Sequence, residues 1–198
     1  SPEFVNDVEL GTRWQNEVLN IDFNLYYMDF ENEIAPIGVY IPEGFYQVYE
    51  NQAPSFRRGA ELIFAYRPNS SWSLNGQFAY LDARISTYAP AGQNVVYEDI
   101  RPILSPEFNG SLQLVYQLEE DFSLALRGRY LSKQSMELSN NPSLVVPESM
   151  VFDFTANYQF YQEHEISLQI NNLTNELYYT YGAPSWDEVG GDQFFYYD

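Results

Sequence analysis

The most regular feature of the chain is a strict alternation of apolar and polar residues in segments long enough to be β-strands. In residues 18–30, the odd positions from 19 to 27 carry Leu, Ile, Phe, Leu and Tyr, while Asn20, Asp22 and Asn24 lie between them. Successive side chains of a strand point to opposite faces, so this period of two predicts a strand with one apolar and one polar face. No segment shows the competing helical spacing.

Seven further segments repeat this alternation, so the chain is predicted to hold about eight strands. They begin near residues 8, 60, 72, 112, 122, 151 and 166. Short polar connections are predicted at 15–17, 67–71, 119–121 and 161–164. Long connections without a clear period are predicted at 31–54, 86–106 and 131–147, and again from 173 onward. The pattern is therefore one of four hairpins joined by long irregular loops.

The regular exchange of short and long connections is typical of outer-membrane barrels, which have short periplasmic turns and long extracellular loops. Soluble β-sandwiches mix their loop lengths. Residues 18–30 would extend roughly 43 Å as a strand, and roughly 33 Å when tilted, which exceeds the apolar band of about 25 Å. Pro2, Pro54, Pro106 and Pro147 stand where a long connection enters a strand, a position that needs no backbone N–H. We therefore predict an all-β fold, an antiparallel transmembrane β-barrel.

These eight strands are expected to form part of a larger barrel. An open sheet would leave two unpaired edges in lipid, where no water satisfies backbone groups. A small closed barrel of eight strands is the alternative. It is disfavoured because the first strand already runs toward a short turn, which places both ends of the chain on the side of the long loops.

Composition agrees with a membrane barrel and excludes several other classes. The chain of 198 residues contains 18 Tyr, 14 Phe and 3 Trp, and such rings anchor strands at membrane interfaces. No apolar run approaches the roughly 20 residues of a spanning helix. The net charge of -19 leaves no basic patch for nucleic acid. Cysteine is absent, which removes disulfides and thiolate metal sites.

Catalytic and metal-binding patterns are not found, so we predict neither an enzyme nor a cofactor. The single histidine, His164, lies in a predicted turn between Glu163 and Glu165, and no Ser-His-Asp arrangement includes it. Acidic loop pairs such as Glu98-Asp99 offer oxygen ligands to calcium, but the spacing of an EF-hand is missing. No metal site is predicted.

Ligand binding is the chemistry that remains, and two groups of residues suit it. Polar positions predicted to face a barrel lumen and contact a substrate are Asp22, Asn24, Glu61, Gln77, Arg127, Arg129 and Asp153. Tyrosines of the long connections predicted to hold a bulky ligand are Tyr40, Tyr46, Tyr88 and Tyr97. The competing interpretation is that the lumen residues only keep the interior wet.

Short motifs resemble one known family, the TonB-dependent outer-membrane transporters. Residues 168–178 are similar to that family's alternating strand followed by an Asn-Leu-Phe-Asn-x-x-Tyr motif; Asn172, Leu173, Asn175 and Tyr178 match, with Thr174 in the place of Phe. The segments 2–11 and 59–62 resemble the family's Pro-Glu…Glu-Leu-Gly and Gly-Ala-Glu strand entries. Their order and the hairpin pattern extend the resemblance over nearly the whole chain.

The resemblance implies a 22-stranded barrel with a plug domain, of which residues 1–198 would be a C-terminal section. It implies active uptake, driven by an inner-membrane energy-coupling protein, of a siderophore, haem, cobalamin or oligosaccharide. The expected partners are membrane lipid and lipopolysaccharide, the plug, a surface lipoprotein and the small-molecule substrate, and the expected location is the bacterial outer membrane. Two alternatives stay open: a passive porin-like channel and a soluble secreted β-sandwich that binds carbohydrate.

Overall fold

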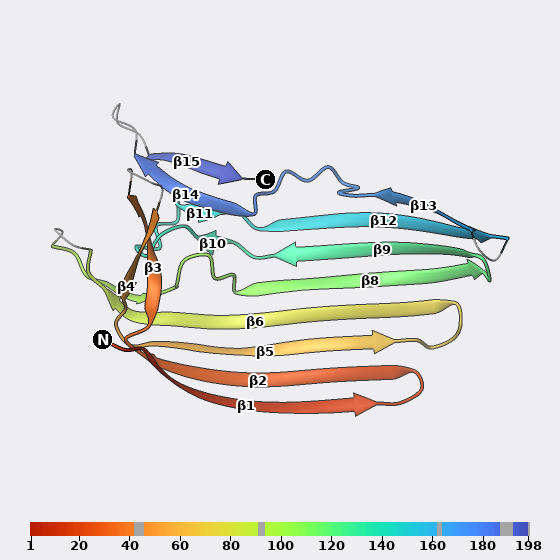
Figure 1. Cartoon of the computed structure of the whole chain (residues 1–198), viewed down its shortest axis with the longest axis horizontal. Helices are drawn as coiled ribbons and strands as arrows, with labels where there is room; N and C mark the ends of the chain where they lie inside the picture. Colours follow the sequence, from red (N-terminus) through yellow and green to blue (C-terminus); the bar gives the residue numbers. More distant parts are fainter. Residues whose placement is uncertain (42–45, 91–93, 162–163, 187–191, 198) are drawn as a thin grey trace.

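The chain folds into one long sheet with smaller hairpins at one end (Figure 1). The structure, a computed structural model, describes residues 1–41, 46–90, 94–161, 164–186 and 192–197, without the side chains of 36–48 and 183–197. Within these ranges, no helix is long and apolar enough to cross a membrane.

Eight antiparallel strands form the main path of the sheet, as the alternation predicted. In spatial order they are β1 (Phe4–Gln15), β2 (Leu19–Glu31), β5 (Ser55–Tyr66), β6 (Trp72–Tyr88), β8 (Phe108–Glu119), β9 (Phe122–Leu131), β12 (Ser149–Phe160) and β13 (His164–Ile170). Each strand pairs with the next one in this order, so the sheet is a series of hairpins. The short turns lie at one end and the long connections at the other (Figure 1); we call these the turn side and the loop side.

One face of the sheet is apolar across all eight strands. A single cross-strand row contains Leu74, Leu114, Leu126, Phe154 and Ile170, each opposite the next. Leu114 and Leu126 are 39% and 42% exposed although they lie in the middle of the sheet. A soluble protein would cover such a face. A barrel wall that meets lipid would leave it open.

Aromatic rings border this apolar face at both ends. On the turn side Trp72 stacks on Tyr116, with 4.3 Å between ring centroids. On the loop side Tyr80 contacts Phe108 at 5.9 Å. Trp72 and Tyr80 are separated by roughly 26 Å along β6, or roughly 20 Å after a barrel-like tilt. The two girdles expected at membrane interfaces are therefore present at a suitable spacing.

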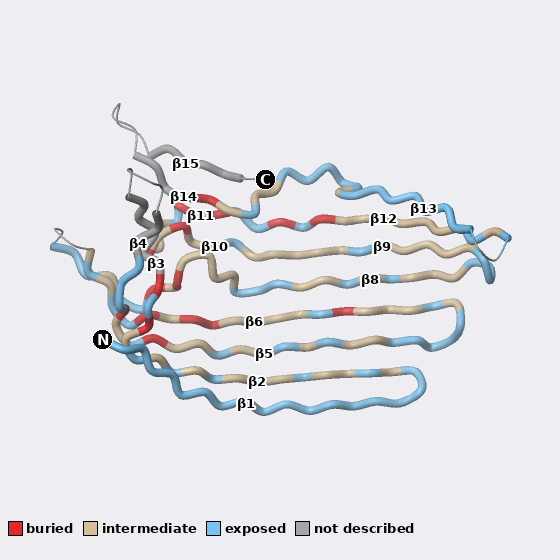
Figure 2. The backbone as a smooth tube through the Cα atoms, in the orientation of Figure 1, coloured by how far each residue is buried: buried red, intermediate tan, exposed pale blue. Residues whose placement is uncertain are grey.

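The sheet is open. In the described part of the chain β1 and β13 do not pair, and all their residues are exposed (Figure 2). The alternative of a small closed barrel is therefore wrong. The proline prediction is confirmed, because Pro54, Pro106 and Pro147 stand just before β5, β8 and β12.

The long connections are more regular than the sequence predicted. The segment 31–54 holds the hairpin of β3 (Ile34–Ile41) and β4 (Tyr46–Asn51), with a register shift between Pro36 and Tyr40. The segment 86–106 contains β7 (Tyr97–Ile100), which pairs with an extended β6. The strands β10 (Gln134–Ser135) and β11 (Val145–Val146) pair within the third connection. The prediction of irregular loops is wrong here because these strands pair locally and are too short or too bulged to show a period.

The chain after residue 173 also contains paired strands, β14 (Tyr181–Trp186) and β15 (Asp192–Tyr197). They pair with each other, so the expectation of a terminal loop is wrong. Among the described residues neither of them pairs with β13, so the main sheet gains no further strand after it.

The buried residues gather at the loop side, where the long connections pack together (Figure 2). Ile85 of β6, Ile100 of β7 and Leu138 form a small core. Asn140 joins two connections, because its side chain accepts a hydrogen bond from the Arg101 N–H (2.6 Å) and donates one to the Arg101 carbonyl (3.0 Å). The loops therefore form a folded cap on one end of the sheet.

Candidate functional site

The seven predicted lumen residues all lie on the polar face of the sheet, as their strand positions required. Asn24 stands opposite Glu61, and Arg127 opposite Asp153. Asp22 and Gln77 flank Ile63 in one row. The sequence therefore placed every one of them on the correct face, although their contact with a substrate stays a prediction.

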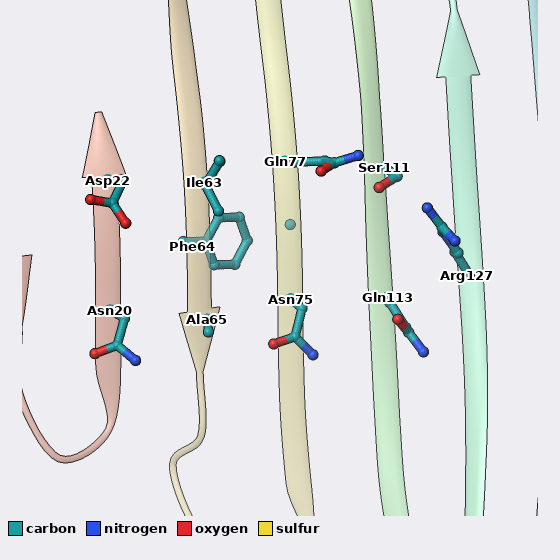
Figure 3. Close-up of a pocket in the computed structure, with 11 residues that line it drawn as sticks. Asn20, Asp22, Ile63, Phe64, Ala65, Asn75, Gln77, Ser111, Gln113 and Arg127 are labelled. Atoms are coloured by element: carbon teal, nitrogen blue, oxygen red, sulfur yellow. The ribbon is translucent and has the colours of Figure 1, made fainter. Parts of the chain in front are cut away.

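A shallow open cavity on this face is lined by three of the seven predicted residues, Asp22, Gln77 and Arg127 (Figure 3). Its polar lining comes from β2, β6, β8 and β9, and includes Asn20, Asp22, Gln77, Gln113 and Arg127, while β5 contributes Ile63, Phe64 and Ala65. These groups donate and accept hydrogen bonds, but none of them forms a pair of nucleophile and base. The arrangement suits the binding of a polar or charged surface and does not suit catalysis.

Arg127 and Arg129 are neighbours on the polar face with different surroundings. Arg129 Nη2 and Nε lie 3.0 and 3.1 Å from Asp153 Oδ2. Arg13 pairs in the same way with Asp22. Among the described residues no carboxylate lies within 4 Å of Arg127, which is exposed. Arg127 is therefore available to an anionic group on whatever occupies the lumen.

Asp153 has a structural role that the sequence did not reveal. Its Oδ1 accepts a hydrogen bond from the Asn172 N–H at 3.0 Å, and the Leu173 N–H donates to the Phe152 carbonyl at 2.6 Å. Asn172 has a φ of 51°, a left-handed conformation that Asn tolerates better than most residues. Asp153, held by Arg129, therefore fixes the turn of the Asn-Leu-Thr-Asn motif.

Two of the predicted loop tyrosines come together in the cap. Tyr88 and Tyr97 stand opposite each other in β6 and β7, with ring centroids 6.4 Å apart, and pack against the core around Ile85. Burial raises the pKa of Tyr88, and the nearby carboxylates of Glu50 and Glu137 raise it further, so its phenol stays protonated and is a hydrogen-bond donor. The side chains of Tyr40 and Tyr46 lie outside the described residues.

A buried charge network at the base of the β3–β4 hairpin escaped the sequence analysis. Glu33 is 6% exposed, forms an ion pair with Arg57, and accepts a hydrogen bond from the Ser55 hydroxyl at 2.5 Å. The Arg57 guanidinium carbon lies 4.5 Å from the centre of the Phe30 ring. Glu33 fell in a predicted loop, so nothing in the sequence indicated its partner.

No group of three or more His, Asp or Glu residues that could hold a metal ion occurs among the described residues. His164 is the first residue of β13 and stacks on the Phe160 ring at 5.4 Å.

An exposed apolar face, two aromatic girdles, a polar opposite face and an open series of hairpins define a section of an outer-membrane β-barrel. The sequence matches the family model described as "TonB dependent receptor-like, beta-barrel" over residues 1–173. The chain belongs to this family, which consists of receptors and not of enzymes. The resemblance and the barrel fold are confirmed, and the alternative of a soluble β-sandwich is wrong.

The relatives and solved structures that resemble the chain are barrels of this kind. A curated relative, the probable TonB-dependent siderophore receptor PiuA of Acinetobacter baumannii, is 23% identical over 185 residues, covering 90% of this chain and 24% of the relative. The crystal structure of that siderophore receptor gives a TM-score of 0.72 at 21% identity, covering 89% of this chain and 25% of that one.

A second solved structure, the ferric-catecholate import receptor Fiu of E. coli K12, gives a TM-score of 0.70 at 22% identity, covering 91% and 25%. The ferric yersiniabactin uptake receptor FyuA of Yersinia pestis gives 0.71 at 16%, covering 98% and 28%. At these identities the likeness shows the fold alone. The chain spans about a quarter of the length of the relatives it matches.

Proposed function

We propose that the chain is part of the wall of an outer-membrane receptor that imports a ferric siderophore. The observation that carries this proposal is the family match over residues 1–173 together with the exposed apolar row across the middle of the sheet. The remaining strands of the wall and a plug domain would lie in other parts of the protein. Those strands would pair with the exposed edges of β1 and β13, and the plug would fill the lumen.

The substrate class follows from the relatives. PiuA is described as a siderophore receptor, Fiu as a ferric-catecholate receptor and FyuA as a ferric yersiniabactin receptor. A structure of similar fold, OprC, is described as a copper transporter, so a copper-bearing ligand is the second candidate. Haem, cobalamin and oligosaccharides have no support among these relatives.

The residues that we propose to act in uptake are those of the polar face and the cap. Arg127 would interact with an anionic group of the plug or of the passing chelate, and Gln77, Asn24 and Glu61 would exchange hydrogen bonds with it. Tyr88 would offer a protonated phenol at the cap, where the ligand arrives. Arg129 and Asp153 bind each other, so we propose that they hold the neighbouring backbone in place and do not contact the ligand.

Energy coupling separates active uptake from a passive channel. We propose that an inner-membrane protein pulls the plug and so opens the lumen, with no covalent chemistry in the barrel. The test is uptake of a ⁵⁵Fe-labelled siderophore by cells that express the full-length protein, with and without the energy-coupling protein. Uptake that disappears without coupling supports the proposal. Uptake that continues unchanged identifies a passive porin-like channel. Preferential accumulation of a copper-labelled chelate over the ⁵⁵Fe-labelled one points to the copper alternative.

A further inference from the structure

A buried carboxylate ties the β3–β4 hairpin to the polar face of the sheet. Glu33 directly precedes β3 and is 6% exposed. Its Oε2 accepts a hydrogen bond from the Ser55 hydroxyl at 2.5 Å, and its Oε1 forms an ion pair with Arg57 Nη2. Ser55 and Arg57 share the face of Glu61 in β5, since their positions differ by even numbers. The carboxylate therefore lies on the lumen side of the wall, at the loop side.

The rest of the hairpin is held to the sheet mainly at the same base. The Gln52 N–H donates to the Glu33 carbonyl at 2.7 Å, which closes the base of the hairpin on itself. The Ile34 N–H donates to Glu3 Oε2 at 2.7 Å, just before β1. β3 and β4 pair with each other, and within the described ranges neither pairs with a strand of the main sheet. The position of the hairpin on the wall therefore depends on base contacts, which include the charge-assisted bonds of Glu33.

The ion pair between Glu33 and Arg57 is suited to exchange. Burying two charges costs desolvation energy that offsets much of their attraction, so such a pair gains little over the same groups in water or with new partners. Arg57 keeps a support without Glu33, because its guanidinium carbon lies 4.5 Å from the centre of the Phe30 ring. Among the described residues its Nε and Nη1 bind no acceptor, and its side chain is 23% exposed. The guanidinium is therefore held in place with donors to spare.

Arg57 lies nearest to the loop side of the four arginines on the polar face of the main sheet. The other three are level with Ile63 or Ala65 of β5, further toward the turn side; they are Arg13, Arg127 and Arg129. The chain carries a net charge of -19, so exposed cations are scarce. An anionic ligand that enters from the loop side would therefore reach Arg57 before the other three.

We propose that Glu33 is a built-in competitor for Arg57, which an anionic group of the arriving ligand displaces. Without ligand, Glu33 occupies Arg57 and keeps the β3–β4 hairpin docked on the wall. A carboxylate or catecholate oxygen of the ligand binds the spare donors of Arg57 and then replaces Glu33, whose carboxylate moves into water as the hairpin is released. An uncharged ligand does not make this exchange. The inference rests on the proposed function, since it requires a ligand that enters the lumen from the loop side.

The test combines ligand binding with amide hydrogen exchange in the full-length protein, purified in detergent. The probes are the anionic ferric complex of a tricatechol siderophore and the uncharged ferric complex of a trihydroxamate siderophore. The variants are Arg57→Gln and Glu33→Gln, which keeps the shape of the side chain and an acceptor for Ser55 but removes the charge. Glu107→Gln is the matched control, because it removes the carboxylate of another ion pair at the loop side, with Arg101 at 3.1 Å.

Removing the competitor is expected to strengthen binding. Glu33→Gln should bind the anionic chelate about fivefold or more tightly than the wild-type protein, because Arg57 is no longer occupied. Arg57→Gln should bind it about tenfold or more weakly. Neither the uncharged chelate nor the Glu107→Gln control should show these changes. In the wild-type protein the anionic chelate should speed amide exchange at Ile34 and Gln52, and the uncharged chelate should not.

A loss of affinity in Glu33→Gln, which a purely structural role of the ion pair predicts, overturns the proposal. An equal gain for both chelates overturns it, and so does unchanged exchange at Ile34 and Gln52 with the anionic chelate bound. A wild-type protein that binds neither chelate contradicts it as well. Uptake of ⁵⁵Fe that still depends on energy coupling would then reject the competitor and keep the proposed function, whereas the loss of coupled uptake rejects the proposed function itself.

Discussion

Three glycines on the apolar face are covered by phenylalanine rings of the adjacent strand, and the pair of Gly76 and Phe64 gives the sharpest prediction. Gly76 of β6 stands directly opposite Phe64 of β5. A Cβ at Gly76 would lie 2.4 Å from Phe64 Cε1 and 2.7 Å from Cζ. The ring therefore occupies the space of the missing side chain. The same contact joins Gly110 with Phe78 at 2.5 Å.

The cost of filling that space follows from these distances. Gly76→Ala forces the Phe64 ring of β5 to move by roughly 1 Å to reach ordinary van der Waals contact. The new methyl group cannot move away instead, because Leu112 Cδ1 of β8 lies 3.2 Å from its position. Overpacking of this kind costs about 1–3 kcal/mol. Gly128→Ala is the matched control, because its Cβ would meet the nearest atom of Phe152 at 3.1 Å, a contact that small shifts relieve.

The assay is guanidinium unfolding of the full-length protein folded into lipid. The folded fraction is measured by the heat-dependent gel shift of the barrel. We expect Gly76→Ala to lower the free energy of unfolding by about 1–3 kcal/mol and Gly128→Ala to lower it much less. Combining Gly76→Ala with Phe64→Leu removes the clash, so the pair should lose less than the two single variants together. Strict additivity of the two changes, or an unaffected Gly76→Ala protein, would refute the ring-over-glycine explanation.

Three further variants test other parts of the account. Leu25→Arg, on the apolar face, is expected to destabilise the folded barrel by about 2–4 kcal/mol, while Asn24→Arg beside it is tolerated; unfolding titrations compare the two, and equal losses would contradict the assignment of faces. Glu33→Ala leaves the Arg57 guanidinium without its carboxylate and is expected to lower the free energy of unfolding by about 1–3 kcal/mol. Amide hydrogen exchange in β3 and β4 should become faster, and unchanged protection there would contradict this role of Glu33. Asp153→Ala is expected to speed exchange at the Asn172 amide without changing siderophore affinity, whereas a change of affinity alone would assign Asp153 to the ligand.

The strands and their faces could be predicted because a period of two is a local property of the sequence. Leu19 to Tyr27 needed no partner to show which side was apolar, and the register then placed Asp22 and Arg127 on the same face of distant strands. The prolines before the strands were equally local signals.

Contacts that depend on which residues stand opposite each other could not be predicted. The packing of Phe64 on Gly76 and the ion pair of Arg129 with Asp153 depend on the register of neighbouring strands. The sequence alone does not specify that register. Glu33 belongs to a connection whose hairpin is interrupted by a register shift after Pro36, so its pairing with Arg57 was invisible as well. The supporting residues of the site were therefore missed while its face was found.

The claim on which the rest depends is that lipid covers one face of the sheet and water the other. Spin labels at Leu114 and Leu126 of the full-length protein in a bilayer, compared with a label at Gln113, measure this directly through collisions with oxygen and with a water-soluble nickel complex. We expect the two leucine positions to be accessible to oxygen and shielded from nickel, and Gln113 to show the reverse. Equal accessibility at Leu114 and Gln113, or leucine labels reached by neither reagent, would contradict a lipid-facing barrel wall.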